Sequence, residues 1–198
     1  MYNIIEDCSP YYIRFTHENI QEIIDICKQE LAKIKLVKNF TNYPFDKELS
    51  EKILNLVPMS YQYSLKKYRV SLFISNPGLY YRAHKDGADN RISFNYTVQI
   101  LDNDCVTNWY SDEDLNEYTI EGLNWTSQSR EAVGFDKTKH TPIKSMIAQP
   151  NECILFNTDI FHDFDNRQSK NVRAILTLRI ENQGNYYFDD VKKTLFDL

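Results

Sequence analysis

The sequence has few cysteines, no long apolar run and no strongly basic stretch, and each absence excludes a class of protein. Its cysteines, Cys8, Cys27, Cys105 and Cys153, are scattered without a C-x-x-C pair, so we expect reduced thiols rather than a disulfide scaffold or a zinc knuckle. No segment approaches the roughly 20 apolar residues of a membrane span. The first nine residues also lack the basic start and apolar run of a signal peptide. We therefore expect a cytoplasmic protein without a membrane anchor.

The balance of charge excludes strong electrostatic attraction to nucleic acid. The net charge is −5 and the calculated isoelectric point is near 5.4, so no overall basic field exists, and we expect no binding to duplex nucleic acid. Hydrophobic residues make up 42% of the 198 residues and aromatic residues 14%. This is ample for one packed core, and we expect a single domain over residues 1–198.

Two amphipathic helices are predicted in the N-terminal part, residues 1–60. Thr16 is a candidate N-cap, and apolar residues then recur at helical spacing on one face, which predicts a helix over residues 17–36. A second helix is expected over residues 46–56. It should end before Pro58, because the residue before a proline resists helical geometry.

Beyond residue 60 the sequence changes to short β-rich runs separated by turn-forming residues. The expected strands cover residues 68–75, 79–84, 91–101, 143–148, 153–157 and 172–180. This pattern predicts a mainly β fold with flanking helices, in which antiparallel strands curl into a jelly roll over residues 68–180.

The polar segment 111–141 is too long for an ordinary connection and is predicted to be an insertion that faces the substrate or covers it. The aromatic residues on or near it either cover a site or simply pack: Trp109, Tyr110, Tyr118 and Trp125.

The first candidate for chemistry is the His84-Lys85-Asp86 triplet at the end of an expected strand. In an extended chain, residues i and i+2 point to the same face, so His84 and Asp86 can converge on one ion while Lys85 points away. Taken alone, the triplet is equally explained by a surface turn, because a His-x-Asp sequence arises often by chance.

The second candidate lies near the end of the β-rich region. An apolar strand leads to His162, and the next strand carries Arg173 and Arg179 into an otherwise apolar run. Each arginine is also explained by a pair with a surface carboxylate, and Arg179 more so than Arg173. Together, two imidazoles and one carboxylate leave three positions open on an iron ion, and a ketoacid takes two of them. A guanidinium then suits its far carboxylate.

These residues resemble the Fe(II)/2-oxoglutarate dioxygenase superfamily over roughly residues 68–180. His84, Asp86, His162 and Arg173 match its His-x-Asp, distal histidine and basic residue. Segment 76–84 is similar to the approach strand of the aspartyl/asparaginyl β-hydroxylase-like and small prolyl hydroxylase-like branches. Segment 91–98 resembles the strand that follows, in which the inward polar residue, here Asn95, contacts the ketoacid.

The resemblance implies a double-stranded β-helix, a distorted jelly roll. It implies Fe(II) held by His84, Asp86 and His162, with 2-oxoglutarate on Arg173 and O2 as the second co-substrate. The implied reaction hydroxylates a C–H bond of a free amino acid or of a side chain in a peptide or protein, and releases succinate and carbon dioxide. We expect the protein's part to be the orientation of ligands and the exclusion of water.

Two alternatives remain at this point. The six-residue spacing of Arg173 and Arg179 also occurs in AlkB-type nucleobase demethylases, although the acidic charge and the short interval from His162 oppose that function. A non-catalytic jelly-roll binding or assembly module is the other. We assign no role to His17 or His140, and at most one aspartate near His162 is expected to orient its ring.

Overall fold

The computed structural model describes residues 2–35, 40–58, 68–86, 91–101, 103–115, 119–122, 130–133, 135–180 and 187–196. Within these ranges the helices are α1 (Ile20–Leu31), α2 (Lys47–Leu56), α3 (Asp112–Leu115) and α4 (Phe188–Phe196). The strands are β1 (Asn3–Cys8), β2 (Tyr12–Thr16), β3 (Phe40–Pro44), β4 (Tyr68–Ser75), β5 (Tyr80–Lys85), β6 (Ile92–Gln99), β7 (Val106–Trp109), β8 (Thr119–Gly122), β9 (Arg130–Val133), β10 (Lys144–Met146), β11 (Cys153–Asn157), β12 (His162–Asp165) and β13 (Arg173–Ile180).

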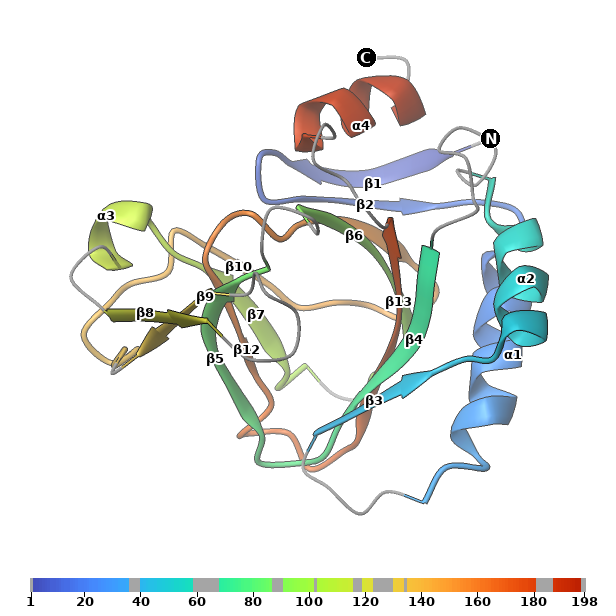
Figure 1. The fold of residues 1–198 in the computed structure, drawn as a ribbon, viewed down its shortest axis with the longest axis horizontal. Coiled ribbons are helices and arrows are strands. Elements are labelled where there is room, and N and C mark those ends of the chain that lie inside the picture. Colours follow the sequence, from blue (N-terminus) through green and yellow to red (C-terminus); the bar gives the residue numbers. More distant parts are fainter. Residues whose placement is uncertain are drawn as a thin grey trace.

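The strands form two sheets that face each other (Figure 1). Sheet A has the order β1-β2-β11-β6-β13-β4-β3, and sheet B has the order β10-β7-β12-β5-β9-β8. Neighbouring described strands pair antiparallel, and the chain alternates between the sheets from β4 to β7 and again from β10 to β13, as in a jelly roll. The predicted mainly β jelly-roll fold is therefore confirmed.

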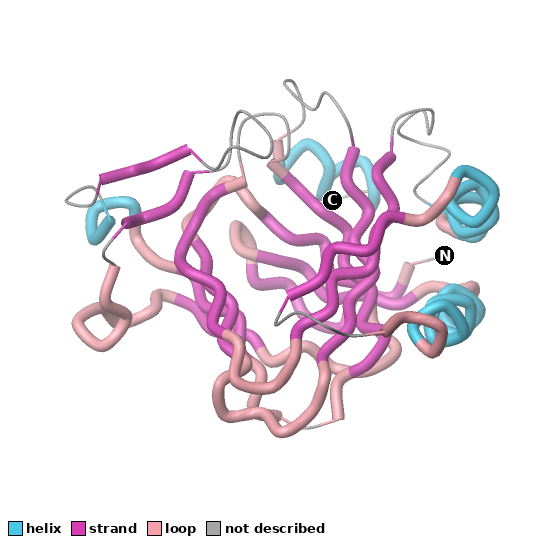
Figure 2. Tube along the Cα trace, turned by 60° about the horizontal axis from the view of Figure 1, so that its bottom comes forward, coloured by secondary structure: helices cyan, strands magenta, loops and turns pink. Residues whose placement is uncertain are grey.

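Helices α1, α2 and α4 cover the outer face of sheet A (Figures 1 and 2). The pleat of the strands decides which side chains these helices cover, because successive side chains of a strand point to opposite faces of the sheet. On β13, Ala174, Leu176 and Leu178 are fully buried in the core that includes residues of α1, α2 and α4. The alternate residues of β13 line a cavity between the sheets instead.

Aromatic side chains fill the other part of the space between the sheets. Trp109 is fully buried on β7, where it stacks on Tyr12 at a ring-centroid distance of 5.2 Å and contacts Phe156 at 4.9 Å. Met146, Ala148 and Ile154 belong to the same cluster. This packing leaves the cavity at the side of the fold where β3, β4 and β5 lie.

The bounds of the expected strands agree closely with the structure, but the helix expected near the N-terminus does not begin where it was predicted. Strands β4 and β11 have the predicted bounds, and α2 begins after the N-cap Asp46, which accepts a hydrogen bond from the backbone N–H of Leu49 at 2.9 Å. The β1–β2 hairpin, however, precedes α1, and α1 begins at Ile20 rather than residue 17. Thr16 is the last residue of β2, so the prediction that it caps the helix is wrong.

The segment 111–141 contains α3, β8 and β9 in its described parts, and β9 pairs with β5 beside His84. Trp109 and Tyr110 are buried and belong to the packing of the sheets. Tyr118 and Trp125 lie outside the described residues. Among the helices that can be described, none has the length and apolar character needed to cross a bilayer.

Candidate active site

The two candidate histidines are partners on neighbouring strands. In the antiparallel register of β5 and β12, His84 lies directly opposite His162, and their ring centroids are 4.3 Å apart. Tyr81 contacts the His84 ring edge-on, and Phe156 contacts the His162 ring in the same way. Both histidines are buried, so the fold brings together two imidazoles that are far apart in sequence.

Backbone carbonyls fix the tautomer of both rings. Nδ1 of His84 lies 2.7 Å from the carbonyl oxygen of Arg82, and Nδ1 of His162 lies 2.9 Å from that of Ile160. Because a carbonyl oxygen only accepts, each Nδ1 carries the proton and each Nε2 keeps its lone pair in the neutral ring. Burial lowers the pKa of His162 to about 3, so this imidazole is neutral at physiological pH. Oriented neutral imidazoles of this kind are typical metal ligands.

Asp86 places a buried carboxylate beside the histidines. Its backbone N–H donates to the carbonyl of Thr158, which holds the end of β5 against the chain that follows β11. Its two carboxylate oxygens have different neighbours: Oδ1 lies 3.7 Å from Nε2 of His84, and Oδ2 accepts from Nη2 of Arg179 at 2.8 Å. Burial opposes ionisation, but Arg179 and the two histidines hold the pKa of Asp86 below its usual range. The carboxylate is therefore ionised.

The donor set fits a divalent transition metal in type, charge and tautomer. Two ligand atoms that each lie about 2.1 Å from a metal are about 3 Å apart when they occupy neighbouring coordination positions. His84 Nε2 and Asp86 Oδ1 are 3.7 Å apart, which is within an ångström of that value. In the described parts of the chain, however, no three His, Cys, Asp or Glu side chains already form a complete cluster.

Arg173 opens β13 and lines the same cavity as the histidines. Its cross-strand partner on β4 is Ser75, and its guanidinium lies over the ring of Phe164 at 3.9 Å from the centroid. Nε of Arg173 is buried and has no hydrogen-bond partner among the residues that the structure describes. Burial lowers the pKa of the guanidinium, which nonetheless stays charged. Arg173 thus presents donors to an anion within the cavity.

The cavity has a volume of about 780 Å³, and Asn95 belongs to its wall. Asn95 lies on β6 opposite Thr177 of β13, on the face of sheet A that turns away from the helices. Its Oδ1 is buried without a hydrogen-bond partner in the described structure. A buried amide oxygen without a donor is costly, so Oδ1 of Asn95 suits a ligand or water that donates a hydrogen bond, whereas a contact with the acceptor oxygens of a ketoacid would have to come from Nδ2.

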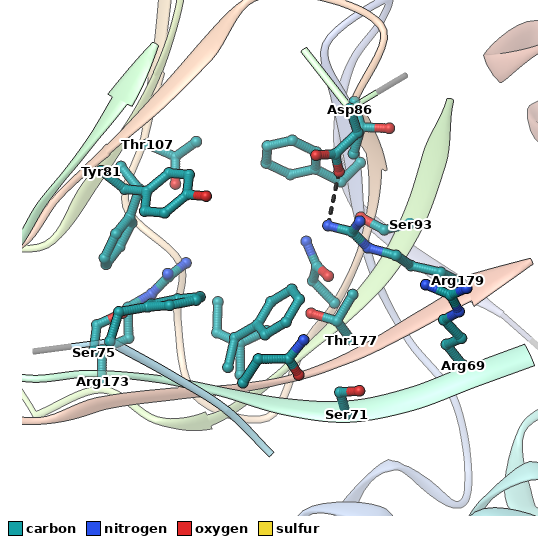
Figure 3. A pocket seen from close by; sticks show the side chains of 18 of the residues that line it. Arg69, Ser71, Ser75, Tyr81, Asp86, Ser93, Thr107, Arg173, Thr177 and Arg179 are labelled. Carbon is teal, nitrogen blue, oxygen red and sulfur yellow. Dashed lines mark ion pairs between the residues drawn. The ribbon is translucent and has the colours of Figure 1, made fainter. Parts of the chain in front are cut away.

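Arg179 is also part of this site, a role that the sequence did not assign to it. A surface carboxylate was the favoured partner, but Arg179 pairs with the buried Asp86 (Figure 3). The expectation of a surface pair is therefore wrong. The six-residue spacing places Arg173 and Arg179 on the same face of β13, since six is a multiple of the two-residue strand repeat. This two-residue periodicity is the feature of the sequence that indicates that Arg179 lies on the same side of the strand as Arg173.

Asp163 and Asp165, which follow His162 on β12, have partners other than its ring. Asp163 is fully buried and accepts hydrogen bonds from Asn108 Nδ2 at 2.8 Å and from Tyr110 Oη at 2.7 Å. These bonds tie β12 to β7 and so hold His162 in place indirectly. His17 bonds Tyr96, and His140 stacks on Phe135, which gives both histidines structural surroundings.

Comparison with known proteins gives a likeness in fold. The sequence matches no protein-family model and no curated protein. Among solved structures, HygX from Streptomyces hygroscopicus with nickel and 2-oxoglutarate bound has a TM-score of 0.58 at 7% identity, over 86% of this chain and 82% of HygX. A 2OG-Fe(II) oxygenase family oxidoreductase from Burkholderia pseudomallei has a TM-score of 0.56 at 11% identity, over 91% and 88% of the two chains.

SnoK, a non-heme alpha ketoglutarate dependent carbocyclase from nogalamycin biosynthesis, is also similar, with a TM-score of 0.53 at 10% identity over 86% of this chain and 79% of SnoK. At these identities the likeness establishes the fold, which is the jelly roll of 2-oxoglutarate oxygenases. The function must be argued from the site itself.

Proposed function

We propose that the protein is an Fe(II)- and 2-oxoglutarate-dependent oxygenase that hydroxylates a C–H bond and releases succinate and carbon dioxide. The observation that carries the proposal is the pairing of His84 with His162 across neighbouring strands. Both Nε2 lone pairs are left available, the ionised Asp86 lies alongside, and all three residues line a cavity that also contains Arg173. Solved structures of the same fold with nickel and 2-oxoglutarate bound support this proposal.

Each residue has a distinct part in the proposed site. His84, Asp86 and His162 would hold the iron, which supplies the activation of O2 when it is bound. Arg173 would form a bidentate pair with the far carboxylate of 2-oxoglutarate, and the amide of Asn95 would donate a further hydrogen bond to the ketoacid. The buried aromatic cluster around Trp109 closes the space behind the site and excludes water.

For the substrate we infer a free amino acid, or a side chain in a peptide or protein. The support is the likeness of segment 76–84 to the approach strand of the hydroxylase branches. A cavity of about 780 Å³ is also within the range of about 300–1,000 Å³ that is common for sites of small organic ligands. A mass-spectrometric screen of amino acids and peptides for the gain of one oxygen tests this inference.

The iron and ketoacid site is tested by spectroscopy under anaerobic conditions. Addition of Fe(II) and 2-oxoglutarate should produce a weak visible charge-transfer band, and admission of oxygen should produce succinate even without substrate. His162→Ala should abolish the band, because it removes one of the nitrogen ligands, and should lower iron affinity by about 100-fold or more.

His140→Gln is the matched control for this experiment. It also removes a histidine, but His140 stacks on Phe135 and is not part of the proposed site. Its band should equal that of the wild type. If the wild type gives neither band nor succinate, the chain is an inert jelly-roll module; if His162→Ala keeps the band, the assigned ligands are wrong.

A further inference from the structure

The cavity reaches the surface of the molecule along β3. Asn42 and Pro44 belong to its wall, yet both are exposed, and Phe40, which also lines it, is half-buried. These three residues alternate along the strand, so they lie on one face of sheet A, the face that turns toward sheet B. Strand β3 therefore forms one rim of the mouth of the cavity.

The free edge of β3 presents backbone hydrogen-bonding groups. Among the described strands, β4 is the neighbour of β3 in sheet A, and β3 is the last strand at that end of the sheet (Figure 1). The N–H of Phe45 donates to the carbonyl of Val70 at 3.0 Å, and this pair continues the antiparallel register of β3 with β4. Hydrogen-bonded pairs alternate with non-hydrogen-bonded pairs in such a ladder. The backbone groups of Phe40, Asn42 and Pro44 consequently point away from β4.

The position of Pro44 agrees with this alternation. A proline has no backbone N–H, and it is tolerated in an edge strand where that group would point away from the neighbouring strand. Pro44 lies two residues after Asn42, so the backbone groups of both residues face the same edge. The edge thus offers the N–H and carbonyl groups of Phe40 and Asn42, and the carbonyl of Pro44.

Strand β3 lacks the features that prevent an edge from pairing with another chain. At the opposite end of sheet A, β1 contains Glu6 and Asp7 and has an irregular register between Ile4 and Glu6, and charges and bulges of this kind oppose pairing. The edge strands of sheet B in the described structure, β10 and β8, have only three and four residues. In contrast, β3 has five residues, none of them charged, and a regular register. Such an edge suits an extended peptide, which brings backbone groups of its own.

A strand added at β3 would direct alternate side chains into the cavity. Residues directly opposite each other on neighbouring strands lie on the same face of a sheet. Peptide residues opposite Phe40 and Asn42 would therefore point toward sheet B, as these two residues do. The Phe40 ring lies 5.4 Å from that of Tyr81, and the Tyr81 ring lies 4.8 Å from that of His84, between centroids. A side chain that enters beside Phe40 is thus directed along these rings toward His84.

We propose that β3 binds an extended peptide segment of the substrate as a further strand of sheet A, and that the oxidised group is a side chain of this segment. That the peptide is a substrate rests on the proposed oxygenase function, whereas its pairing with β3 does not depend on that function. A free amino acid is too short to use the alternating groups along the edge. The peptide backbone would supply affinity, and the alternate side chains in the cavity would supply specificity.

Synthetic peptides test the pairing. A random library of N-acetylated hexapeptide amides is passed over immobilised protein, both without metal and loaded with zinc and 2-oxoglutarate, so that no turnover occurs. Retained peptides are sequenced by mass spectrometry and made again with single N-methyl groups, and calorimetry gives each Kd. An N-methyl group removes one backbone donor and leaves the side chains unchanged. It should weaken binding about fivefold or more at alternate residues, whose N–H groups face β3, and much less at the residues between them.

The substitution Asn42→Pro tests the same hydrogen bond from the side of the protein. It removes an N–H that points away from β4 and leaves the ladder between β3 and β4 intact, as Pro44 does. Peptide binding should weaken about fivefold or more. Asn42→Ala is the matched control: it loses the same amide side chain but keeps the backbone N–H, and it should keep most of the affinity. The midpoint of urea denaturation shows that the variants are folded, and the N-methylated peptides test the bond without any change to the protein.

The proposal is overturned if the wild type retains no peptide, if N-methyl groups act uniformly along the peptide, or if Asn42→Pro and Asn42→Ala bind peptides equally. Alternating effects of N-methylation in a protein that fails to bind zinc and 2-oxoglutarate would support the peptide site and remove the oxygenase function. Oxidation of a free amino acid without retention of any peptide would do the reverse.

Discussion

The two faces of sheet A have opposite compositions, although the same strands supply both. On β13 the side toward the helices carries Ala174, Leu176 and Leu178, all fully buried, whereas the side toward sheet B carries two arginines, a threonine and one isoleucine. Strands β4 and β6 alternate in the same manner. The pleat therefore separates the residues that stabilise the fold from those that line the site. Substitutions on the two faces should have different effects, and the following predictions use that difference.

The largest expected effect on stability is on the helix side of β13. Leu176→Ala should lower the free energy of unfolding by about 2–5 kcal/mol, because it leaves a hole in a core that buries this side chain completely. Urea denaturation measures the change. The neighbouring substitution Thr177→Ser removes one methyl group on the cavity side and should cost less than about 1 kcal/mol. Similar losses for both variants would contradict the separation of the two faces.

A buried histidine on the helix side should make stability depend on pH. Nε2 of His17 lies 3.0 Å from the hydroxyl of Tyr96, and burial lowers the pKa of His17 to about 4. The folded-state pKa is thus below the unfolded value near 6.5, so this contribution is complete above about pH 6.5 and is lost as the pH falls toward 4. The loss is on the order of 3 kcal/mol.

Urea denaturation from pH 7.5 to 4 measures the free energy of unfolding of the wild type and of His17→Gln. The difference between the two proteins isolates the contribution of His17, because the other titrating groups are common to both. The wild type should lose stability faster than the variant over this range. Parallel curves would mean that His17 is not buried as a neutral ring.

Both the success and the failure of the sequence predictions for the fold follow from burial. Strand β11 was predicted with its bounds because it is an apolar run, and β4 because its apolar residues alternate with polar ones, both of which follow from burial. The hairpin of β1 and β2 was missed because β1 is an exposed edge strand and shows little alternation. Helix α1 begins late because His17 turns inward to Tyr96, and Asn19 donates to the carbonyl of Leu56 rather than capping the helix.

For the candidate site, the sequence indicated residues that are close in the chain or match a motif. The spacing of His84 and Asp86 places them on one side of a strand end, and Arg173 follows His162 by one strand. The pairing of His84 with His162 depends on the register of β5 and β12, and the contact between Arg179 and Asp86 depends on the packing of the two sheets. Neither is encoded locally, so neither could be predicted from spacing alone.

Arg173 on the cavity side should affect binding far more than stability. Arg173→Gln removes a charged partner of the 2-oxoglutarate carboxylate and should weaken its binding by about 2 kcal/mol, or about thirtyfold in Kd. Calorimetric titration of 2-oxoglutarate into the zinc-loaded protein measures this. Arg167→Gln, an exposed arginine paired with Asp165, should bind normally. An unchanged Kd in Arg173→Gln would assign the ketoacid to another cation.

The smallest expected effect distinguishes two polar residues on the cavity side of β6. Oδ1 of Asn95 and Oγ1 of Thr97 are both buried without hydrogen-bond partners in the described structure, but Asn95 lines the cavity and Thr97 does not. Asn95→Ala should weaken 2-oxoglutarate binding about fivefold, the value of one neutral hydrogen bond, with little loss of stability. Thr97→Val should instead stabilise the fold slightly, because it removes a buried hydroxyl without a partner, and should leave the Kd unchanged. If both variants change the Kd equally, the effect is one of packing on β6, and Asn95 does not contact the ketoacid.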